Sequence, residues 1–396
     1  PSRVKRSRTR LATREAIRLN TDLRNDSAMA DNELMVANCQ RQLGEYDSAL
    51  ESFQRTIEYF HSLNDQHLER RARIALADFY NSMFRDADAL AIASDAATAA
   101  RVFSDTGDSY RALTVVARSN HRLGRFDDEL AALTDLARID SQAYRGRDRV
   151  ILLRSMMKAS EGSGDQDKCD EIFNRWKGLA VSAGDTPSLA EAWYERGLYM
   201  QSLGRPDGAA LALSQALGFA GKSGDAPLRA NILSALGNLA YGAKRFEDAR
   251  RHYVDALQLA RTEDSFVLRT ILVLAIVACD SKTGAESPGS AVPDLIKRCT
   301  AIAGECRQNG FSRGEALANF ISGRLSEMAD DPAAAMPFYR SAAGLHEQSP
   351  LQPETRDLNF VETYLRGEEA GWYDPLIRLS CGSGQVDSAF SDIERR

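Results

Sequence analysis

The residue types that carry out acid–base and metal chemistry are scattered along this chain of 396 residues. His61 and His67 lie six positions apart, which is too far round a helix for a pair of metal ligands. His121, His252 and His346 have no cysteine or acidic residue at ligand spacing. We therefore expect no metal site and no cofactor.

The six cysteines are also spread out, with no short metal-ligand pair, as expected for reduced, buried thiols in a cytoplasmic protein. Gly221-Lys222-Ser223 resembles part of a phosphate-binding loop, but Ala216 stands where the motif needs a glycine, and no strand precedes it. No Gly-x-Ser-x-Gly nucleophile motif occurs. We expect no catalysis within these residues, although sequence separation alone leaves a Cys/His pair open.

The composition indicates a large folded protein, with 43% hydrophobic and 27% charged residues. No apolar run approaches the roughly 18 residues that a membrane-spanning helix needs. The net charge of −6 conceals a basic segment at residues 1–24, so the rest of the chain is more acidic than the total suggests. Net charge therefore argues against a polyanion-binding role for the bulk of the protein.

A repeat of forty residues organises most of the sequence. Leu43-Gly44-Glu45-Tyr46 returns as Leu123-Gly124-Arg125-Phe126, and again as Leu203-Gly204-Arg205-Pro206. Small residues dominate the positions seven before and five after each anchor, as two closely packed helices require. The anchors are Gly44, Phe84, Gly124, Gly164, Gly204 and Lys244.

Each repeat reads as a helix hairpin, in which the anchor ends the first helix in a left-handed conformation. Pro206 and Pro332 then stand in the first turn of the following helix. Turns between hairpins are expected where a glycine precedes an Asp or Thr N-cap, as at Gly184-Asp185 and Gly224-Asp225, and also at Thr106-Gly107-Asp108. No segment has the alternation of a strand.

The chain divides into three regions by this pattern. Residues 1–29 form a basic N-terminal helix or linker, and residues 30–346 form the repeat array with an insertion loop at 281–291. Residues 347–396 are a degenerate C-terminal hairpin or a connector to a following domain.

The Leu-Gly-x-Tyr/Phe and small-residue pattern resembles that of tetratricopeptide repeat (TPR) proteins of a long-repeat type. The resemblance implies an all-α, right-handed superhelical solenoid of about eight antiparallel helix hairpins. It also implies a binding scaffold whose first helices line a concave groove for a peptide or a partner helix. Asn38 lacks the neighbours of the two-carboxylate clamp of chaperone-binding TPR domains, which argues against recognition of chaperone C-termini.

The resemblance places a basic series on the inner face of repeats two to four, although Asp78 and Glu161 dilute it. Repeats five and six offer neutral hydrogen-bonding groups there instead. Either these are ordinary solvated helix faces, or they hold an acidic segment of a partner protein. The predicted partner-binding residues are Arg71, Arg111, Arg118, Arg122, Arg154, Lys158, Tyr194, Asn231, Asn238 and Tyr241.

The C-terminal stretch from Glu354 through Trp372-Tyr373-Asp374-Pro375 to Arg396 is similar to the junction between TPR repeats and CHAT domains, which are caspase-like cysteine peptidases. The resemblance implies the regulatory arm of a larger effector, with any catalytic domain beyond Arg396. The competing interpretation of this stretch is an irregular hairpin whose Leu376, Ile377 and Leu379 cover the end of the array.

Two other functions remain as hypotheses. One is a free-standing TPR peptide receptor or adaptor. The other is nucleic-acid binding through residues 1–24, which no aromatic residue supports by stacking.

Overall fold

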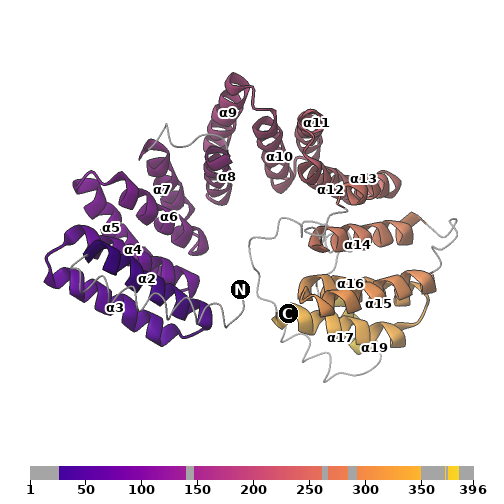
Figure 1. Ribbon diagram of the computed structural model, residues 1–396. Helices are drawn as coiled ribbons and strands as arrows, with labels where there is room; N and C mark the ends of the chain where they lie inside the picture. The colour runs from indigo at the N-terminus through magenta and orange to yellow at the C-terminus, as the bar shows by residue number, and fades with distance from the viewer. Residues whose placement is uncertain are drawn as a thin grey trace. The chain divides into compact units, whose positions relative to one another are not determined.

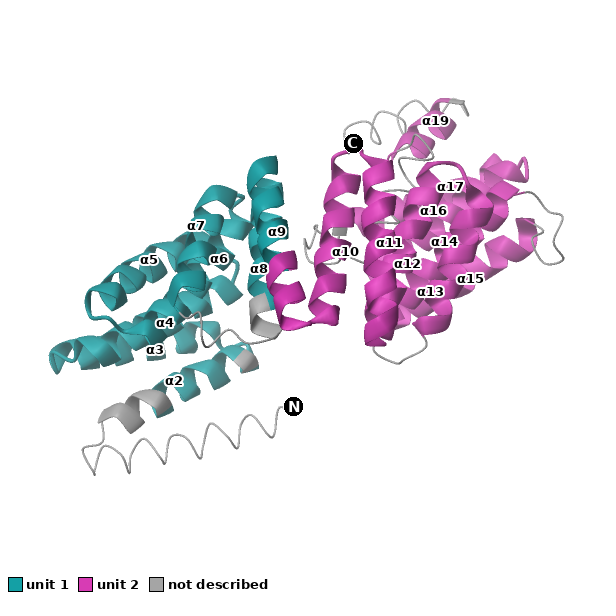
Figure 2. Ribbon diagram, turned by 90° about the horizontal axis from the view of Figure 1, so that it is seen from above, with its two compact units in different colours: residues 1–176 teal, residues 177–396 magenta. Residues whose placement is uncertain are grey.

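We describe residues 26–139, 147–260, 266–283, 292–348, 371 and 373–382 of the protein from a computed structural model. All regular secondary structure in these ranges is α-helical, as predicted. No helix within them is long and apolar enough to span a membrane. The chain forms two compact units, residues 1–176 and 177–396, and each is described by itself (Figure 2).

Unit 1 is a succession of antiparallel helix hairpins (Figure 1). The two helices of the pairs α2/α3, α4/α5 and α6/α7 pack on each other, and the first helices α2, α4 and α6 also contact one another in order. Its helices are α2 (Asp26–Leu43), α3 (Tyr46–Ser62), α4 (Gln66–Ser82), α5 (Asp86–Val102), α6 (Thr106–Arg122), α7 (Phe126–Ile139), α8 (Arg147–Gly162) and most of α9 (Gln166–Ala183).

Unit 2 continues the hairpins, with tight pairs α10/α11, α12/α13 and α16/α17. Its helices are α10 (Thr186–Ser202), α11 (Pro206–Ser223), α12 (Ala226–Gly242), α13 (Phe246–Leu259), α14 (Phe266–Thr283), α15 (Val292–Gln308), α16 (Ser312–Met328), α17 (Pro332–Gln348) and α19 (Asp374–Gly382).

The insertion predicted in the seventh hairpin coincides with a change in packing. Helix α14 packs mainly on α13, and α15 mainly on α16, so the two contact each other little. Residues 281–283 of the predicted loop are the last residues of α14, because the helix continues to Thr283. The remainder of the loop, residues 284–291, lies outside the described residues.

The repeat anchors have the left-handed backbone that the sequence predicts. The φ angle is +81° at Gly44, +69° at Gly124 and +67° at Gly204. It is also positive at two anchors that are not glycine, +58° at Phe84 and +60° at Lys244. The position in the repeat therefore determines the left-handed turn, and residues other than glycine adopt it there at a cost in backbone strain.

The small residues at the predicted crossing points are buried. Ala37, Ala77, Ala49 and Ala89 are fully enclosed. A Cβ atom at Gly237 would lie 2.5 Å from Cε1 of Tyr253, so the tyrosine ring takes the place of a side chain there. Close approach of the two helices thus depends on the missing side chain, as the repeat pattern predicts.

Aspartates cap the first helices of successive hairpins. The side chains of Asp65, Asp105, Asp185 and Asp225 each accept a hydrogen bond from the backbone N–H three residues on. At Thr106-Gly107-Asp108 the prediction was wrong in detail. The left-handed residue is Ser104 and the cap is Asp105, which leaves Gly107 inside the first turn of α6.

The C-terminal helix α19 covers the end of unit 2. It packs on α17, with Leu376 2% exposed, and the hydroxyl of Tyr373 donates to Oε1 of Glu347 at 3.0 Å. The predicted basic segment at residues 1–24 and most of the CHAT-like stretch, from Glu354 to 370 and from 383 to Arg396, lie outside the described residues.

Candidate partner-binding site

One pocket of unit 1 gathers three of the predicted partner-binding arginines. Helices α2, α4 and α6 enclose a volume of about 390 Å³, and Arg71, Arg111 and Arg118 line it. We call this site the arginine pocket. Its other lining residues are Leu34, Ile74, Ala75, Asp78, Asp108, Tyr110, Thr114 and Val115.

The forty-residue period explains how these side chains meet. Arg71 of α4 and Arg111 of α6 occupy the same repeat position, and so do Asp78 and Arg118, seven residues further along each helix. Between these two ends lie Ile74 and Val115, which are buried. The pocket therefore has an arginine pair at one end, an apolar middle and an acid–base pair at the other end.

Ion pairs hold two of the arginines within the pocket. Nη1 of Arg118 donates to Oδ1 of Asp78 at 2.9 Å, and both side chains are about half exposed. Nη1 of Arg111 lies 3.4 Å from Oδ1 of Asp108, with the arginine 60% exposed and the aspartate 2% exposed. Because Asp108 also pairs with Arg70, the exposed Arg111 guanidinium can exchange this partner for a ligand carboxylate.

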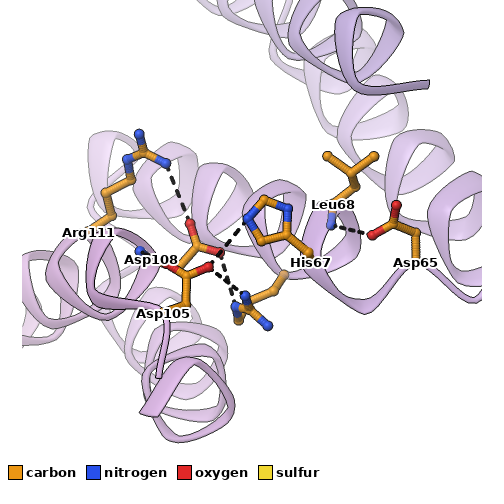
Figure 3. A network of polar contacts seen from close by, with 7 residues as sticks. Asp65, His67, Leu68, Asp105, Asp108 and Arg111 are labelled. Carbon is orange, nitrogen blue, oxygen red and sulfur yellow. Dashed lines mark hydrogen bonds and ion pairs between the residues drawn. The ribbon is translucent and has the colours of Figure 1, made fainter. Parts of the chain in front are cut away.

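A buried network beneath the pocket fixes Asp108. Nε of Arg70 donates to Oδ2 of Asp108 at 3.0 Å, and Nη2 donates to Oδ2 of Asp105 at 2.8 Å. Figure 3 shows His67, Asp105 and Asp108 converging, with Arg111 beside Oδ1 of Asp108, the oxygen that Arg70 does not contact. The N–H of Asp108 and the guanidinium of Arg70 hold the pKa of Asp105 below its usual value.

The same network contains a group with the composition of a metal site. The ligand atoms of His67, Asp105 and Asp108 lie within 4.8 Å of one another. The Arg70 guanidinium is 6% exposed and already donates to both carboxylates. A cation between them would have to displace this buried positive charge, so the network joins two hairpins and does not suit a metal ion.

Three other predicted residues of unit 1 lie outside the arginine pocket. Nη1 of Arg122 donates to the Asn81 carbonyl at 2.6 Å and lies 3.3 Å from Oδ1 of Asp86, and its guanidinium stacks over the Phe84 ring. Arg122 thus joins two hairpins. Arg154 and Lys158 are half-buried on α8, and neither contributes to the pocket lining.

In unit 2, three of the four predicted partner-binding residues are buried. Tyr194, Asn238 and Tyr241 are only 6%, 3% and 3% exposed, so their side chains pack mainly against other residues of the unit. The hydroxyl of Tyr253 donates to Oδ1 of Asn238 at 2.8 Å, which it reaches because Gly237 leaves room for the ring. Asn231 remains half-buried on α12.

The sequence did not reveal the apolar middle of the arginine pocket or the Arg70 network. Ile74 follows Arg71 by three residues and Val115 follows Arg111 by four. Leu34 occupies the repeat position of Ile74, forty residues earlier. That spacing on one helix face was the available signal. The pairing of Arg70 with Asp105 and Asp108 depends on the angle between hairpins, which no local pattern encodes.

A larger pocket of about 610 Å³ lies in unit 2 between α13, α14 and α15. Its lining is mainly apolar, and its two charged residues, Arg269 and Glu305, have opposite signs. It contains none of the predicted residues. We favour the arginine pocket as the candidate site because its three arginines outnumber its two aspartates, which leaves a net positive charge for an acidic ligand, whereas the charges of the larger pocket balance.

No family model and no curated protein sequence matches this chain. Among solved structures, the apo form of RapI aligns over 87% of this chain and 98% of its own, at 10% identity and a TM-score of 0.56. The fold is a helical solenoid of the TPR type. At this identity the similarity to RapI describes the fold alone.

Two further structures align with lower scores. The apo form of the quorum sensor NprR from B. thuringiensis covers 89% of this TPR-type chain and 99% of its own, at 14% identity and a TM-score of 0.44. A signal transduction ATPase with a TPR sensor from Pyrococcus horikoshii covers 86% of this chain and 52% of its own, at 12% identity and a TM-score of 0.44.

Proposed function

We propose that this TPR-type chain is a non-catalytic protein-interaction scaffold whose arginine pocket binds an acidic peptide segment of a partner protein. The observation that carries the proposal is the meeting of Arg71, Arg111 and Arg118 around an apolar middle. Guanidinium groups bind carboxylates through charge-assisted hydrogen bonds. The apolar middle adds a seat for one hydrophobic side chain of the same segment.

Several features support recognition of a protein over chemistry on a small substrate. The pocket is lined by no cysteine or histidine, and its two aspartates, Asp78 and Asp108, are paired with arginines. Five of the six cysteines are buried, and burial raises the pKa of Cys279, Cys299 and Cys306 to about 12. Such thiols are poor nucleophiles and suit the reducing cytoplasm, where we propose that the protein works.

In the larger context, we propose that the array is the sensor or regulatory region of a bigger effector, with a CHAT peptidase as the candidate on the C-terminal resemblance. The alternative is a free-standing peptide receptor or adaptor. The coding sequence after Arg396 distinguishes the two, because only the first requires a further domain with a catalytic Cys and His.

Selection from a displayed library of random peptides on the intact chain tests the binding proposal. We expect enrichment of peptides in which Asp or Glu stands beside Leu, Ile, Val, Phe or Tyr. The double variant Arg111→Glu/Arg118→Glu should weaken binding of the selected peptides by about 30-fold or more, because the first reversal turns an attraction into a repulsion and the second adds another negative charge to the pocket.

A matched control carries the same charge change elsewhere on unit 1. Arg73 pairs with Glu69 and Arg101 with Asp135, and neither lines the pocket. Arg73→Glu/Arg101→Glu should therefore leave peptide affinity within about twofold, as expected for exposed charges outside a binding site. Equal peptide affinity for Arg111→Glu/Arg118→Glu and the unaltered chain would refute the proposal.

A further inference from the structure

The arginine pocket contains its own competing carboxylate. Asp78 and Arg118 occupy the same position in consecutive repeats and meet at 2.9 Å across α4 and α6. Both side chains are about half exposed, so neither is needed to keep a buried charge neutral. The pair lies inside the pocket, at the end away from Arg71 and Arg111.

The two aspartates of the pocket differ in what they do. Asp108 is 2% exposed and is fixed by Nε of the buried Arg70, so it belongs to the packing between hairpins. Asp78 bonds to an arginine that faces the pocket, and its helix position needs no acid for capping or packing. Asp78 therefore changes the charge that a ligand meets without contributing to the buried structure.

The register of the helices gives the distance between the two ends. Seven residues separate Arg111 from Arg118 along α6, and an α-helix rises about 1.5 Å per residue, so the ends are about 10 Å apart. A carboxylate at Arg71 and Arg111 would bring a neighbouring apolar side chain over Ile74 and Val115. A second carboxylate further along the ligand would meet Asp78.

We propose that Asp78 is a specificity-determining residue of the arginine pocket. Its carboxylate occupies Arg118, so the pocket accepts a peptide with a single acidic residue next to an apolar one and disfavours polyanions such as oligoglutamate. This inference rests on the proposed function, because it concerns the ligand of the same pocket.

Two labelled probes test the proposal by fluorescence anisotropy on the full chain. One is hexaglutamate, and the other is a capped Ala-Leu-Glu-Leu-Ala peptide with one carboxylate. The unaltered chain should bind the single-carboxylate probe at least tenfold more tightly than hexaglutamate. Asp78→Asn should raise the affinity for hexaglutamate about tenfold, with a steeper dependence on salt, because Arg118 becomes available to a second carboxylate. Affinity for the single-carboxylate probe should change less than twofold.

Asp95→Asn is the matched control, since Asp95 is an exposed aspartate of α5 that does not line the pocket. It removes the same charge and should change neither affinity. Equal hexaglutamate affinity for Asp78→Asn and the unaltered chain would overturn the inference. Equally tight binding of hexaglutamate and of the single-carboxylate probe by the unaltered chain would also overturn the inference.

The two proposals fail in different ways. If Arg111→Glu/Arg118→Glu weakens the single-carboxylate probe but Asp78→Asn changes nothing, only the role of Asp78 is wrong. If the double reversal has no effect on that probe, or if the unaltered chain binds neither probe, the proposed function of the pocket fails as well.

Discussion

Arg70 of α4 donates from Nε to Oδ2 of Asp108 in α6 at 3.0 Å, with both side chains almost completely buried. The contact joins the second hairpin to the first turn of the third hairpin. Its acceptor also lies against Arg111 at the edge of the arginine pocket. Packing between repeats and the geometry of the candidate site therefore share one carboxylate.

Replacing Arg70 should destabilise unit 1 strongly. Arg70→Met keeps much of the side-chain volume but removes the buried cation of the Asp108 carboxylate and leaves only the exposed Arg111 beside it, at a cost of about 3 kcal/mol. Urea unfolding followed by circular dichroism should show an earlier transition. Arg73→Met is the control on the same helix, because Arg73 is half exposed and its pair with Glu69 contributes at most about 1 kcal/mol. Equal shifts for the two variants would contradict the role of the buried network.

Alanine at Gly237 should destabilise unit 2, since its Cβ would lie 2.5 Å from Cε1 of Tyr253. The ring must move and lose its hydrogen bond to Asn238, which we expect to cost about 1 to 3 kcal/mol. Gly218 provides a matched position inside α11 with nothing within 4 Å of the added Cβ. Gly218→Ala should stabilise by about 0.5 to 1 kcal/mol. Thermal unfolding of both variants measures the difference, and shifts in the same direction would refute the close-packing argument.

The strained anchor at Lys244 should gain stability when it becomes glycine. Its φ is +60°, a conformation that costs an L-residue about 1 to 2 kcal/mol. Lys244→Gly should raise the unfolding temperature. Gly204→Ala should lower it through backbone strain alone, because φ is +67° at Gly204 and an added Cβ would contact nothing within 4 Å. A lower unfolding temperature for Lys244→Gly would show that the lysine side chain contributes more than the backbone strain costs.

Two half-buried histidines predict a dependence of stability on pH. Burial lowers the pKa of His252 and of His346 below the ordinary value of 6.5. Between the pKa of the unfolded chain, about 6.5, and the lower pKa of the folded protein, each histidine binds more protons in the unfolded chain. Stability therefore falls as the pH drops through and below about 6.5. His252→Gln/His346→Gln should reduce the loss of unfolding temperature between pH 7.5 and 5.5. An unchanged pH dependence in the double variant would exclude these two groups as its source.

Much of the fold was predictable because its signals are local. A left-handed turn at Gly44 or Gly204 and a helix start at Pro206 depend on a few neighbouring residues. Phe84 and Lys244 take the same turn without glycine, and only the forty-residue register identifies them. The end of α14 at Thr283 could have been placed from Gly284, the next residue in the sequence, but the polar stretch that begins at Ser281 predicted an earlier end.

The candidate site was predicted in part. Arg71 of α4 and Arg111 and Arg118 of α6 lie on the same face of consecutive first helices, so the repeat register located them. Asn238 occupies the repeat position of Arg118 but is buried, as are Tyr194 and Tyr241, because burial depends on what packs against a side chain from another helix. The ring of Tyr253 packs over Gly237, and its hydroxyl donates a hydrogen bond to Asn238. Sequence spacing does not predict that contact.

Photo-crosslinking tests the location of the binding site most directly. A benzophenone side chain in place of Thr114 would stand within the arginine pocket, whereas one in place of Thr98 would stand on an exposed part of α5. The account predicts that a library-selected acidic peptide crosslinks to the chain labelled at position 114, that Arg111→Glu/Arg118→Glu abolishes this product, and that the chain labelled at position 98 gives none. Crosslinking at position 98 alone, or a product at position 114 that survives the double reversal, would contradict the account.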